Sequence, residues 1–196
     1  EMYENKYLSN KPTQPTTGPI GDAMKSYYIH GDASCLGIIM RAAQPFAMRY
    51  PFVNVKGNAG TLISSGNYAA ARYTKSRLSP LGEYIFQGIE KETIQEWREG
   101  IDESKYYPAI TPSKGFYGIC NGSTGIGIGM ASSIPQYNLK EMNQALEHLL
   151  LNPECSFDDI YIAPDFATGA VLLNEDEVKE SMNKGTGFAC KLRSVV

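Results

Sequence analysis

The residues best suited to chemistry lie in the segment AAARYTKSRLS, residues 69–79. Tyr73 follows Arg72 directly, and Lys75 and Arg77 come shortly after it. A free tyrosine has a pKa of about 10, so it needs a nearby cation or base to act as a nucleophile at neutral pH. Arg72 is such a cation, so Tyr73 is a candidate nucleophile toward a phosphodiester.

Acidic residues are absent from two long stretches around this segment. No Asp or Glu occurs between residues 33 and 82 or between residues 104 and 140, although the chain has a net charge of −3. Such a charge distribution attracts polyanions and predicts a nucleic acid as partner. The first stretch contains six basic residues: Arg41, Arg49, Lys56, Arg72, Lys75 and Arg77.

Length and composition set the class of protein. The 196 residues suffice for one large domain or two small ones with a hydrophobic core. No apolar run reaches the ~18 residues of a membrane span, and the polar N-terminus is unlike a signal peptide. The first residue is Glu1 rather than Met, which indicates a piece of a longer polypeptide. Four scattered cysteines without a C-x-x-C pair predict a reduced, cytoplasmic protein with no metal site of its own.

The first half of the chain is expected to hold an arm and two helices. Residues 1–19 contain three prolines and are typical of an arm, and residues 20–28 favour a short helix. A longer helix, capped by Asp32 or Ser34, is expected to run to Gln44 before Pro45; its apolar positions are Leu36, Ile39, Met40 and Ala43. Its polar side, which includes Arg41, suits a DNA groove or an ordinary solvent-exposed surface equally well.

A hairpin is expected next. Residues 52–66, FVNVKGNAGTLISSG, look like two short strands around a glycine-rich turn. A helix, a two-stranded hairpin and a basic segment in this order outline a winged helix, with Tyr73 just beyond the wing. The sequence therefore predicts an α+β fold with a winged-helix (CAP-like) DNA-binding domain.

Four further elements are expected from residue 78 onward. Residues 78–101 indicate a helix whose apolar stripe includes Trp97, a residue that we expect in the core. Asn138 should cap another helix, strand-like pieces follow at residues 155–173, and residues 175–184 favour a short acidic helix.

The glycine-rich segment NGSTGIGIGM, residues 121–130, invites a phosphate-binding interpretation. No Gly-Lys-Ser/Thr follows it, and its glycine spacing differs from the dinucleotide fingerprint. The alternative is a tight turn in which glycines let backbones approach closely, with Ile126, Ile128 and Met130 in the core.

Three motifs in register resemble the A-type (breakage–reunion) subunit of type IIA DNA topoisomerases, which comprise gyrase A and topoisomerase IV C subunits. The first is HGD with RAAQPFAMRY, residues 30–50, and the second is KGNAG followed by AAARYT, residues 56–74. The third is NGSTGIGIGMASSIPQYNL with APDFATGAVL, residues 121–139 and 163–172. The resemblance covers the chain from about residue 15 onward, with about one extra residue in the wing.

The resemblance implies roles for individual residues. Tyr73 matches the tyrosine that becomes 5′-phosphotyrosyl, Arg72 the arginine that assists it, and His30 a histidine near the cleavage site. Ile126 matches the isoleucine that wedges between base pairs and bends DNA. The expected DNA contacts are Arg41, Lys56, Lys75, Arg77, Ser123, Thr124 and Ile126.

The resemblance also marks departures from the family pattern. Ala33 and Gly37 fall where bacterial enzymes usually carry the serine and the acidic residue that anchor quinolone drugs. A second catalytic arginine is expected upstream of residue 15, and no matching segment is present there.

The implied architecture is a winged-helix domain over residues 1–104 and the beginning of an α/β tower domain over residues 105–196. The implied partners are double-stranded DNA, a second copy of the A-type subunit, and a B-type subunit whose toprim domain supplies Mg²⁺ and which binds ATP. Two other functions compete with this one: a winged-helix module that binds DNA without cleaving it, and a nucleotide-binding enzyme centred on residues 121–130.

Overall fold

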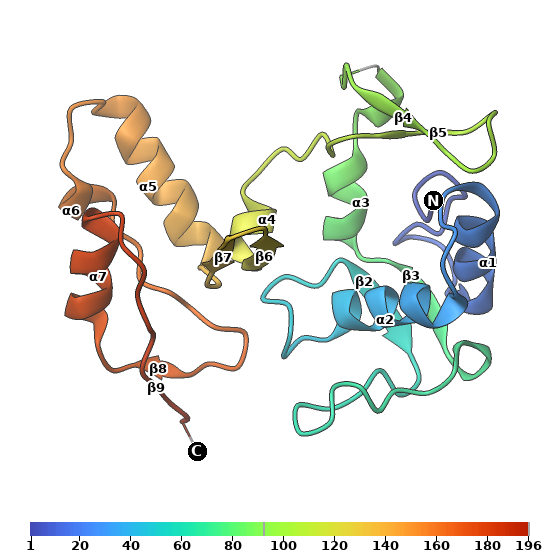
Figure 1. The fold of residues 1–196 in the computed structure, drawn as a ribbon, viewed down its shortest axis with the longest axis horizontal. Helices are drawn as coiled ribbons and strands as arrows, with labels where there is room; N and C mark the ends of the chain where they lie inside the picture. Colours follow the sequence, from blue (N-terminus) through green and yellow to red (C-terminus); the bar gives the residue numbers. More distant parts are fainter. Residues whose placement is uncertain (92, 196) are drawn as a thin grey trace. The chain divides into compact units, whose positions relative to one another are not determined.

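The chain contains both helices and short strands and divides into two units (Figure 1). The structure is a computed structural model that describes residues 1–91 and 93–195. The first unit is Glu1–Gly115 and the second is Phe116–Val196. Within the described residues, no helix has the length and apolar character needed to cross a membrane.

A three-stranded antiparallel sheet organises the first unit. Strands β1 (Gln14–Pro15), β2 (Val53–Lys56) and β3 (Lys75–Leu78) lie in the order β1-β3-β2, so the first strand pairs with the last. Helix α1 (Thr17–Ser26) packs on α2 (Asp32–Ala43), and α2 packs on β2. The buried core between these elements comprises Ile20, Cys35, Ile39 and Val53.

Helix α2 confirms the expected span and its end at Gln44. The prediction of its cap is wrong: Gly31 occupies the N-cap position, and no side chain caps the helix there. Asp32 lies in the first turn instead, where its negative charge favours the positive end of the helix dipole.

The expected hairpin within residues 52–66 is only half right. Strand β2 forms as predicted, but its partner is β3, so residues 57–74 form one long loop. The second strand predicted from the sequence is replaced by a turn in which the backbones of Thr61 and Ser64 exchange hydrogen bonds of 3.2 and 3.1 Å. Tyr73 therefore belongs to the loop itself and immediately precedes β3.

The long helix expected over residues 78–101 is wrong. Helix α3 spans only Pro80–Phe86, and Gly88 adopts a φ of +95°, which L-residues rarely adopt. A 3-10 turn, η2 (Ile89–Lys91), and strand β4 (Trp97–Glu99) follow. Trp97 is not a core residue, because 38% of its surface is exposed.

Strand β4 pairs with β5 (Tyr106–Pro108), and the two strands lie on either side of the domain boundary expected after residue 104. A boundary after residue 104 would separate two hydrogen-bonded strands. The first unit accordingly extends to Gly115.

Within residues 116–195, the second unit contains eight helices and strands. They are α4 (Tyr117–Cys120), β6 (Ser123–Gly127), β7 (Met130–Ile134), α5 (Leu139–Leu151), α6 (Phe157–Ile160), β8 (Val171–Leu172), α7 (Glu175–Asn183) and β9 (Leu192–Arg193). Strand β6 pairs with β7 and β8 with β9, both antiparallel.

Two predictions for the second unit have opposite outcomes. Asn138 caps α5 as expected, because its Oδ1 accepts hydrogen bonds from the backbone N–H groups of Lys140 (2.9 Å) and Glu141 (3.4 Å). The strands expected over residues 155–173 are mostly wrong. Ser156 and Asp159 bond to each other at 2.7 and 2.9 Å and begin the helical turn α6 instead.

Candidate nucleic-acid interface

Tyr73 and Arg72 are displayed between two anchored neighbours. Ala71 packs against the hydrophobic core, and Thr74 is only 1% exposed. Between them, the 3-10 turn η1 (Ala71–Tyr73) leaves Arg72 exposed and Tyr73 69% exposed. A large aromatic side chain held outward in this way is available to a partner.

Thr74 fixes the end of this turn. Its hydroxyl lies 2.9 Å from that of Thr16, and its carbonyl accepts a hydrogen bond of 3.0 Å from the Thr16 N–H. Both threonines are buried, and Thr16 directly precedes α1. The position of Tyr73 is therefore set by the body of the unit, although its side chain lies at the surface.

The Arg72 guanidinium lies against the Tyr73 ring. The Arg72 Cζ atom is 4.8 Å from the ring centroid, within the range of a cation–π contact. This arrangement holds a permanent positive charge beside the phenol. A cation here is placed to offset negative charge that develops on a phosphate bound beside the ring.

Gly57 lies directly against the backbone of Tyr73. Its φ is +113°, and a Cβ at this position would lie 3.1 Å from both the Tyr73 carbonyl oxygen and the Thr74 Cγ2. Only glycine adopts this positive φ and also leaves room for the Tyr73 carbonyl without strain. The sequence indicated a turn at KGNAG, but the contact with Tyr73 depends on the fold.

Gln44 organises the other end of the long loop. Its side chain is 3% exposed, and its Nε2 donates to the carbonyls of Ala59 (2.7 Å) and Ser65 (2.8 Å). A Cβ on Gly60 would lie 2.6 Å from the same Ser65 oxygen. Sequence reasoning treated Gln44 only as a helix end and did not detect this role.

Two lysines face each other across the strands next to Tyr73. Lys56 ends β2 and Lys75 begins β3, and the two are direct partners in the antiparallel register. Both are exposed, and neither forms an ion pair with any residue that the structure describes. Like charges placed directly opposite destabilise a sheet. A bound polyanion would remove this repulsion.

The other two basic residues among the expected DNA contacts, Arg41 and Arg77, differ in how exposed they are. Arg41 is exposed and shares one face of α2 with Ser34 and Ile38, as their spacing of four and three residues requires. Arg77 is half-buried, and its Nη1 donates to the Lys11 carbonyl at 2.6 Å. Part of its guanidinium is thus committed to holding the N-terminal arm.

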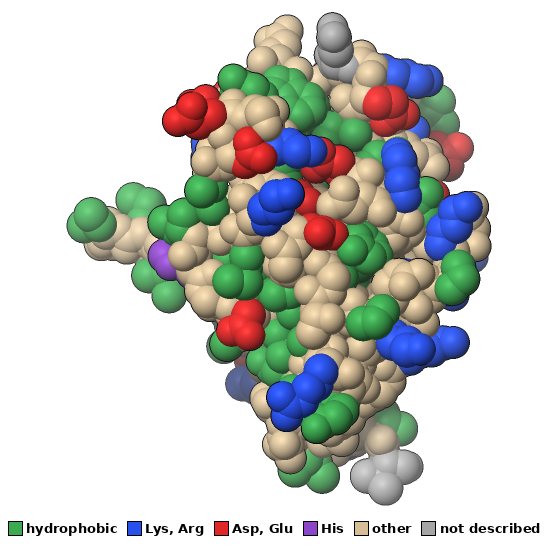
Figure 2. Space-filling view, turned by 90° about the vertical axis from the view of Figure 1, so that its right-hand side faces the viewer, with side chains coloured by type: hydrophobic (Ala, Val, Ile, Leu, Met, Phe, Trp, Pro, Cys, Tyr) green, Lys and Arg blue, Asp and Glu red, His purple; other side chains and the backbone are tan. Residues whose placement is uncertain are grey.

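The face shown in Figure 2 has an uneven charge distribution. Acidic side chains occur in its upper and middle parts, whereas Lys and Arg side chains continue into its lower part. This distribution agrees with the absence of acids from residues 33–82.

His30 lies apart from the Tyr73–Arg72 pair in its contacts. Its exposed ring meets the Tyr28 ring edge-on, with centroids 5.1 Å apart. Among the described residues, no hydrogen bond or ring contact joins His30 to Tyr73. The resemblance predicts that both residues act near the same cleavage site. The contacts among the described residues do not bring them together.

The two positions that the family resemblance relates to drug binding lie in the first turns of α2. Ala33 is exposed. Gly37 is half-buried, and a Cβ there would lie 3.3 Å from the Tyr68 hydroxyl. Tyr68, from the long loop, was not singled out by the sequence.

The β6–β7 hairpin exposes apolar side chains in the second unit. Ile126 is 96% exposed, Ile128 103% and Met130 76%. The alternative that placed these three residues in the core is therefore wrong. Gly129, with a φ of +75°, forms the turn.

Ser123 and Thr124 lie on the same hairpin. Both are exposed on β6, opposite Ile134 and Ser133 of β7. The expected DNA contacts are thus shared between the two units, each of which presents its own set. Among the described residues, no three His, Cys, Asp or Glu side chains form a metal-binding cluster.

Comparison with known proteins assigns the chain to a family. The family model that describes the A subunit of DNA gyrase/topoisomerase IV matches residues 1–195. The chain is similar to the DNA gyrase A subunit of Thermotoga maritima, with 40% identity over 189 residues, covering 95% of this chain and 23% of the relative. It is similar to the DNA gyrase A subunit of Pseudomonas aeruginosa, with 36% identity over 191 residues, covering 95% and 20%.

A third relative carries the other name of the family. The A subunit of DNA topoisomerase 4 from Rickettsia bellii is 38% identical over 162 residues, covering 81% of this chain and 22% of the relative. The chain thus spans less than a quarter of the length of these curated relatives. From its motifs, its family model and these relatives, the chain belongs to the family of DNA gyrase and topoisomerase IV A subunits.

Proposed function

We propose that this chain is the DNA-cleaving part of the A-type subunit of a type IIA topoisomerase, with Tyr73 as nucleophile. The observation that carries the proposal is the exposed Tyr73 ring beneath the Arg72 guanidinium, next to the facing lysines Lys56 and Lys75. The arrangement combines a nucleophile, a fixed cation and a surface for a polyanion.

The proposed step exchanges one phosphodiester for another. The Tyr73 oxygen bonds to phosphorus while the bond to the DNA 3′ oxygen breaks, and the phenol proton leaves so that a 3′ hydroxyl results. The DNA 5′ end stays on Tyr73. Reversal of the same exchange reseals the strand, so the exchange itself needs no ATP. Arg72 stabilises the negative charge that develops on the Tyr73 oxygen and on the phosphate oxygens during this exchange.

We assign the first unit to a winged helix that holds DNA against Tyr73. The exposed face of α2, with Ser34, Ile38 and Arg41, suits a DNA groove. The loop between β2 and β3 corresponds to the wing, and its lysine pair supports contacts to phosphates.

Mg²⁺, ATP and partner subunits belong to the same proposal. The acid-free segment around Tyr73 does not fit a Mg²⁺ site, because that ion prefers carboxylate oxygens. We therefore assign Mg²⁺ to the toprim domain of a B-type subunit, which also binds ATP, and we expect two A-type subunits to act on one duplex in the cytoplasm.

The test is the substitution Tyr73→Phe in the reconstituted enzyme. Phenylalanine keeps the ring over Arg72 and removes only the hydroxyl, so covalent protein–DNA adducts trapped with detergent should vanish while DNA affinity stays within about twofold. Tyr106→Phe is the matched control, because Tyr106 is another exposed tyrosine, outside the loop of residues 57–74. It should leave adduct formation intact.

Two outcomes would be adverse. Covalent adducts formed by the Tyr73→Phe variant would remove Tyr73 as nucleophile. Absence of adducts from the unsubstituted enzyme would favour the second candidate, a DNA-binding module without cleavage activity.

A further inference from the structure

The loop of residues 57–74 carries two apolar side chains, Leu62 and Ile63, at a turn in its middle. Leu62 is 64% exposed and Ile63 98%. They are the central residues of a tight turn, because the backbones of Thr61 and Ser64 on either side bond to each other. Turns of this kind are usually built from Gly, Asn, Asp or Ser. Two adjacent aliphatic residues, here named the loop tip, are unusual at such a position and indicate a contact with a partner.

Hydrogen bonds between the two limbs of the loop, before and after this turn, hold the loop tip in place. The Asn58 carbonyl accepts from the Ala69 N–H at 3.0 Å, and its Nδ2 donates to the Asn67 carbonyl at 3.2 Å. Its Oδ1 accepts from the Gly60 N–H at 2.9 Å. The buried Gln44 side chain donates to a carbonyl on each limb and so joins both to the end of α2. The loop tip is therefore positioned before any partner binds.

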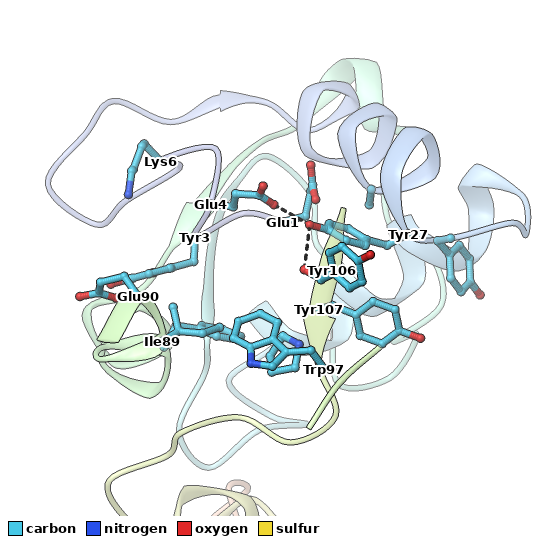
Figure 3. Close-up of a pocket in the computed structure, with 14 residues that line it drawn as sticks. Glu1, Tyr3, Glu4, Lys6, Tyr27, Ile89, Glu90, Trp97, Tyr106 and Tyr107 are labelled. Atoms are coloured by element: carbon cyan, nitrogen blue, oxygen red, sulfur yellow. Dashed lines mark hydrogen bonds between the residues drawn. The ribbon is translucent and has the colours of Figure 1, made fainter. Parts of the chain in front are cut away.

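Other exposed apolar side chains of the first unit pack on one another. Trp97, Tyr106 and Tyr107 line one cavity, and the Tyr107 ring meets that of Tyr27 edge-on with centroids 5.7 Å apart (Figure 3). The loop tip is not part of that cavity. Its exposure is thus not explained by the aromatic cluster.

The charge around the loop favours DNA as the partner. The strands at its two ends each carry an exposed lysine, Lys56 and Lys75, and the loop itself contains Arg72 and no Asp or Glu. A segment with this charge attracts phosphates. Apolar side chains such as Leu and Ile pack into DNA grooves against sugars and base edges. An apolar pocket of a protein partner would need no such charge, so duplex DNA fits the loop better.

We propose that the loop tip is an apolar DNA contact, which packs against deoxyribose rings and base edges while the neighbouring lysines bind phosphates. This inference rests on the proposed function, in which the same loop presents Tyr73. Because hydrogen bonds brace the loop, a contact at its tip also fixes the duplex relative to Tyr73 at its end.

The test is the affinity for a DNA duplex over a range of salt concentrations. It uses the reconstituted enzyme with Tyr73→Phe and without Mg²⁺, so that binding is measured apart from cleavage. The double variant Leu62→Ala, Ile63→Ala should bind about tenfold more weakly, because apolar contact area is lost. The slope of log Kd against log salt should stay unchanged, because no phosphate contact is lost. The melting temperature should also stay unchanged, since both side chains are exposed in the free chain.

Two single variants in the same background provide matched comparisons. Lys56→Gln should also weaken binding, but it should reduce the magnitude of the salt slope by about 0.9, as expected for one phosphate contact. Leu150→Ala removes an aliphatic side chain that is 70% exposed on α5. It should change neither the affinity nor the slope.

Three results would overturn the proposal. Unchanged DNA affinity of the double variant would show that the loop tip does not contact DNA, and loss of B-type subunit binding would then identify a protein partner. A slope reduced as much as by Lys56→Gln would indicate lost phosphate contacts instead of an apolar contact. An equal loss of affinity from Leu150→Ala would show that the effect is not specific to the loop tip.

The experiment also separates this inference from the proposed function. If the Tyr73→Phe enzyme binds no duplex, both fail together. If it binds the duplex and the double variant binds equally well, only the role of the loop tip is wrong.

Discussion

At the scale of single residues, Ile126 shows how exposure separates two roles. A buried isoleucine contributes to stability, whereas a DNA wedge must stand free in the unbound chain. Because Ile126 is 96% exposed, Ile126→Ala should lower the free energy of unfolding by less than about 1 kcal/mol. Ile39→Ala, in the core at 8% exposure, should cost about 2–5 kcal/mol.

The same substitution should act on DNA. If Ile126 fills an unstacked base step, its truncation should reduce bending of an end-labelled duplex, measured by fluorescence energy transfer in the complex. Cleavage by Tyr73 should fall with it. A large drop in melting temperature together with unchanged bending would contradict the wedge role.

The two positions that the resemblance relates to drug binding give a second prediction at this scale. Ala33 lacks a hydroxyl and Gly37 a carboxylate, so drug-stabilised cleavage should need far more ciprofloxacin than in a typical bacterial enzyme. The double variant Ala33→Ser, Gly37→Asp should lower that requirement, provided that Tyr68 moves by a few tenths of an ångström. Gly37→Asn in the same background, which lacks the charge, should not. Ordinary sensitivity of the unsubstituted enzyme would refute this.

At the scale of elements, the loop of residues 57–74 holds Tyr73 through its glycines. Gly57→Ala places a Cβ at a φ of +113° and 3.1 Å from the Tyr73 carbonyl, a strain of about 1–3 kcal/mol. Cleavage should fall at least tenfold, with a smaller loss of DNA affinity. Gly66→Ala, in open space of the same loop, should leave both unchanged. Similar losses from both variants would show that the loop does not position Tyr73.

Elements with a strong local signal could be predicted from the sequence, and those built by distant contacts could not. Helix α2 follows from its apolar spacing, and the cap of α5 from Asn138. Strand β3, KSRL, has no alternating apolar pattern because its buried positions include Ser76, so its pairing with β2 was missed. In the site, the sequence shows that Arg72 and Tyr73 are adjacent. The contact of Gly57 with the Tyr73 backbone and the hydrogen bonds of Thr16 to Thr74 join distant segments, so only the fold shows them.

At the scale of the whole first unit, the N-terminal arm is tied to the β4–β5 hairpin by charge. Glu4 accepts hydrogen bonds from Lys105 (2.5 Å) and Tyr27 (2.8 Å). Burial alone would raise the pKa of Glu4, but these two hydrogen bonds together with the positive charges of Lys105 and the N-terminus hold the pKa below its ordinary value.

A pKa that is lower in the folded state than in the unfolded state fixes the direction in which stability changes with pH. The stability from Glu4 is fully present above the unfolded-state pKa of about 4.3 and is lost as the pH falls through the lower folded-state value. The melting temperature should therefore drop on acidification below about pH 4.3, and Glu4→Gln should make that drop shallower. Glu103→Gln should not change it. If the melting temperature of the Glu4→Gln variant depends on pH in the same way as that of the unsubstituted protein, the stabilising interaction of Glu4 with Lys105 and Tyr27 is contradicted.

The placement of the arm also dictates when the first unit can be completed during synthesis. Three of its ties reach far along the sequence: Thr16 to Thr74, Ser9 to Glu83, and Glu4 to Lys105. The arm leaves the ribosome before the rest of this unit and must wait until its last partner, Lys105, has emerged about a hundred residues later. Until then α1 and α2 can pair locally, but the sheet lacks β3, the strand that joins its two ends. Such non-local closure slows folding and leaves β1 and β2 as unpaired edges in the nascent chain.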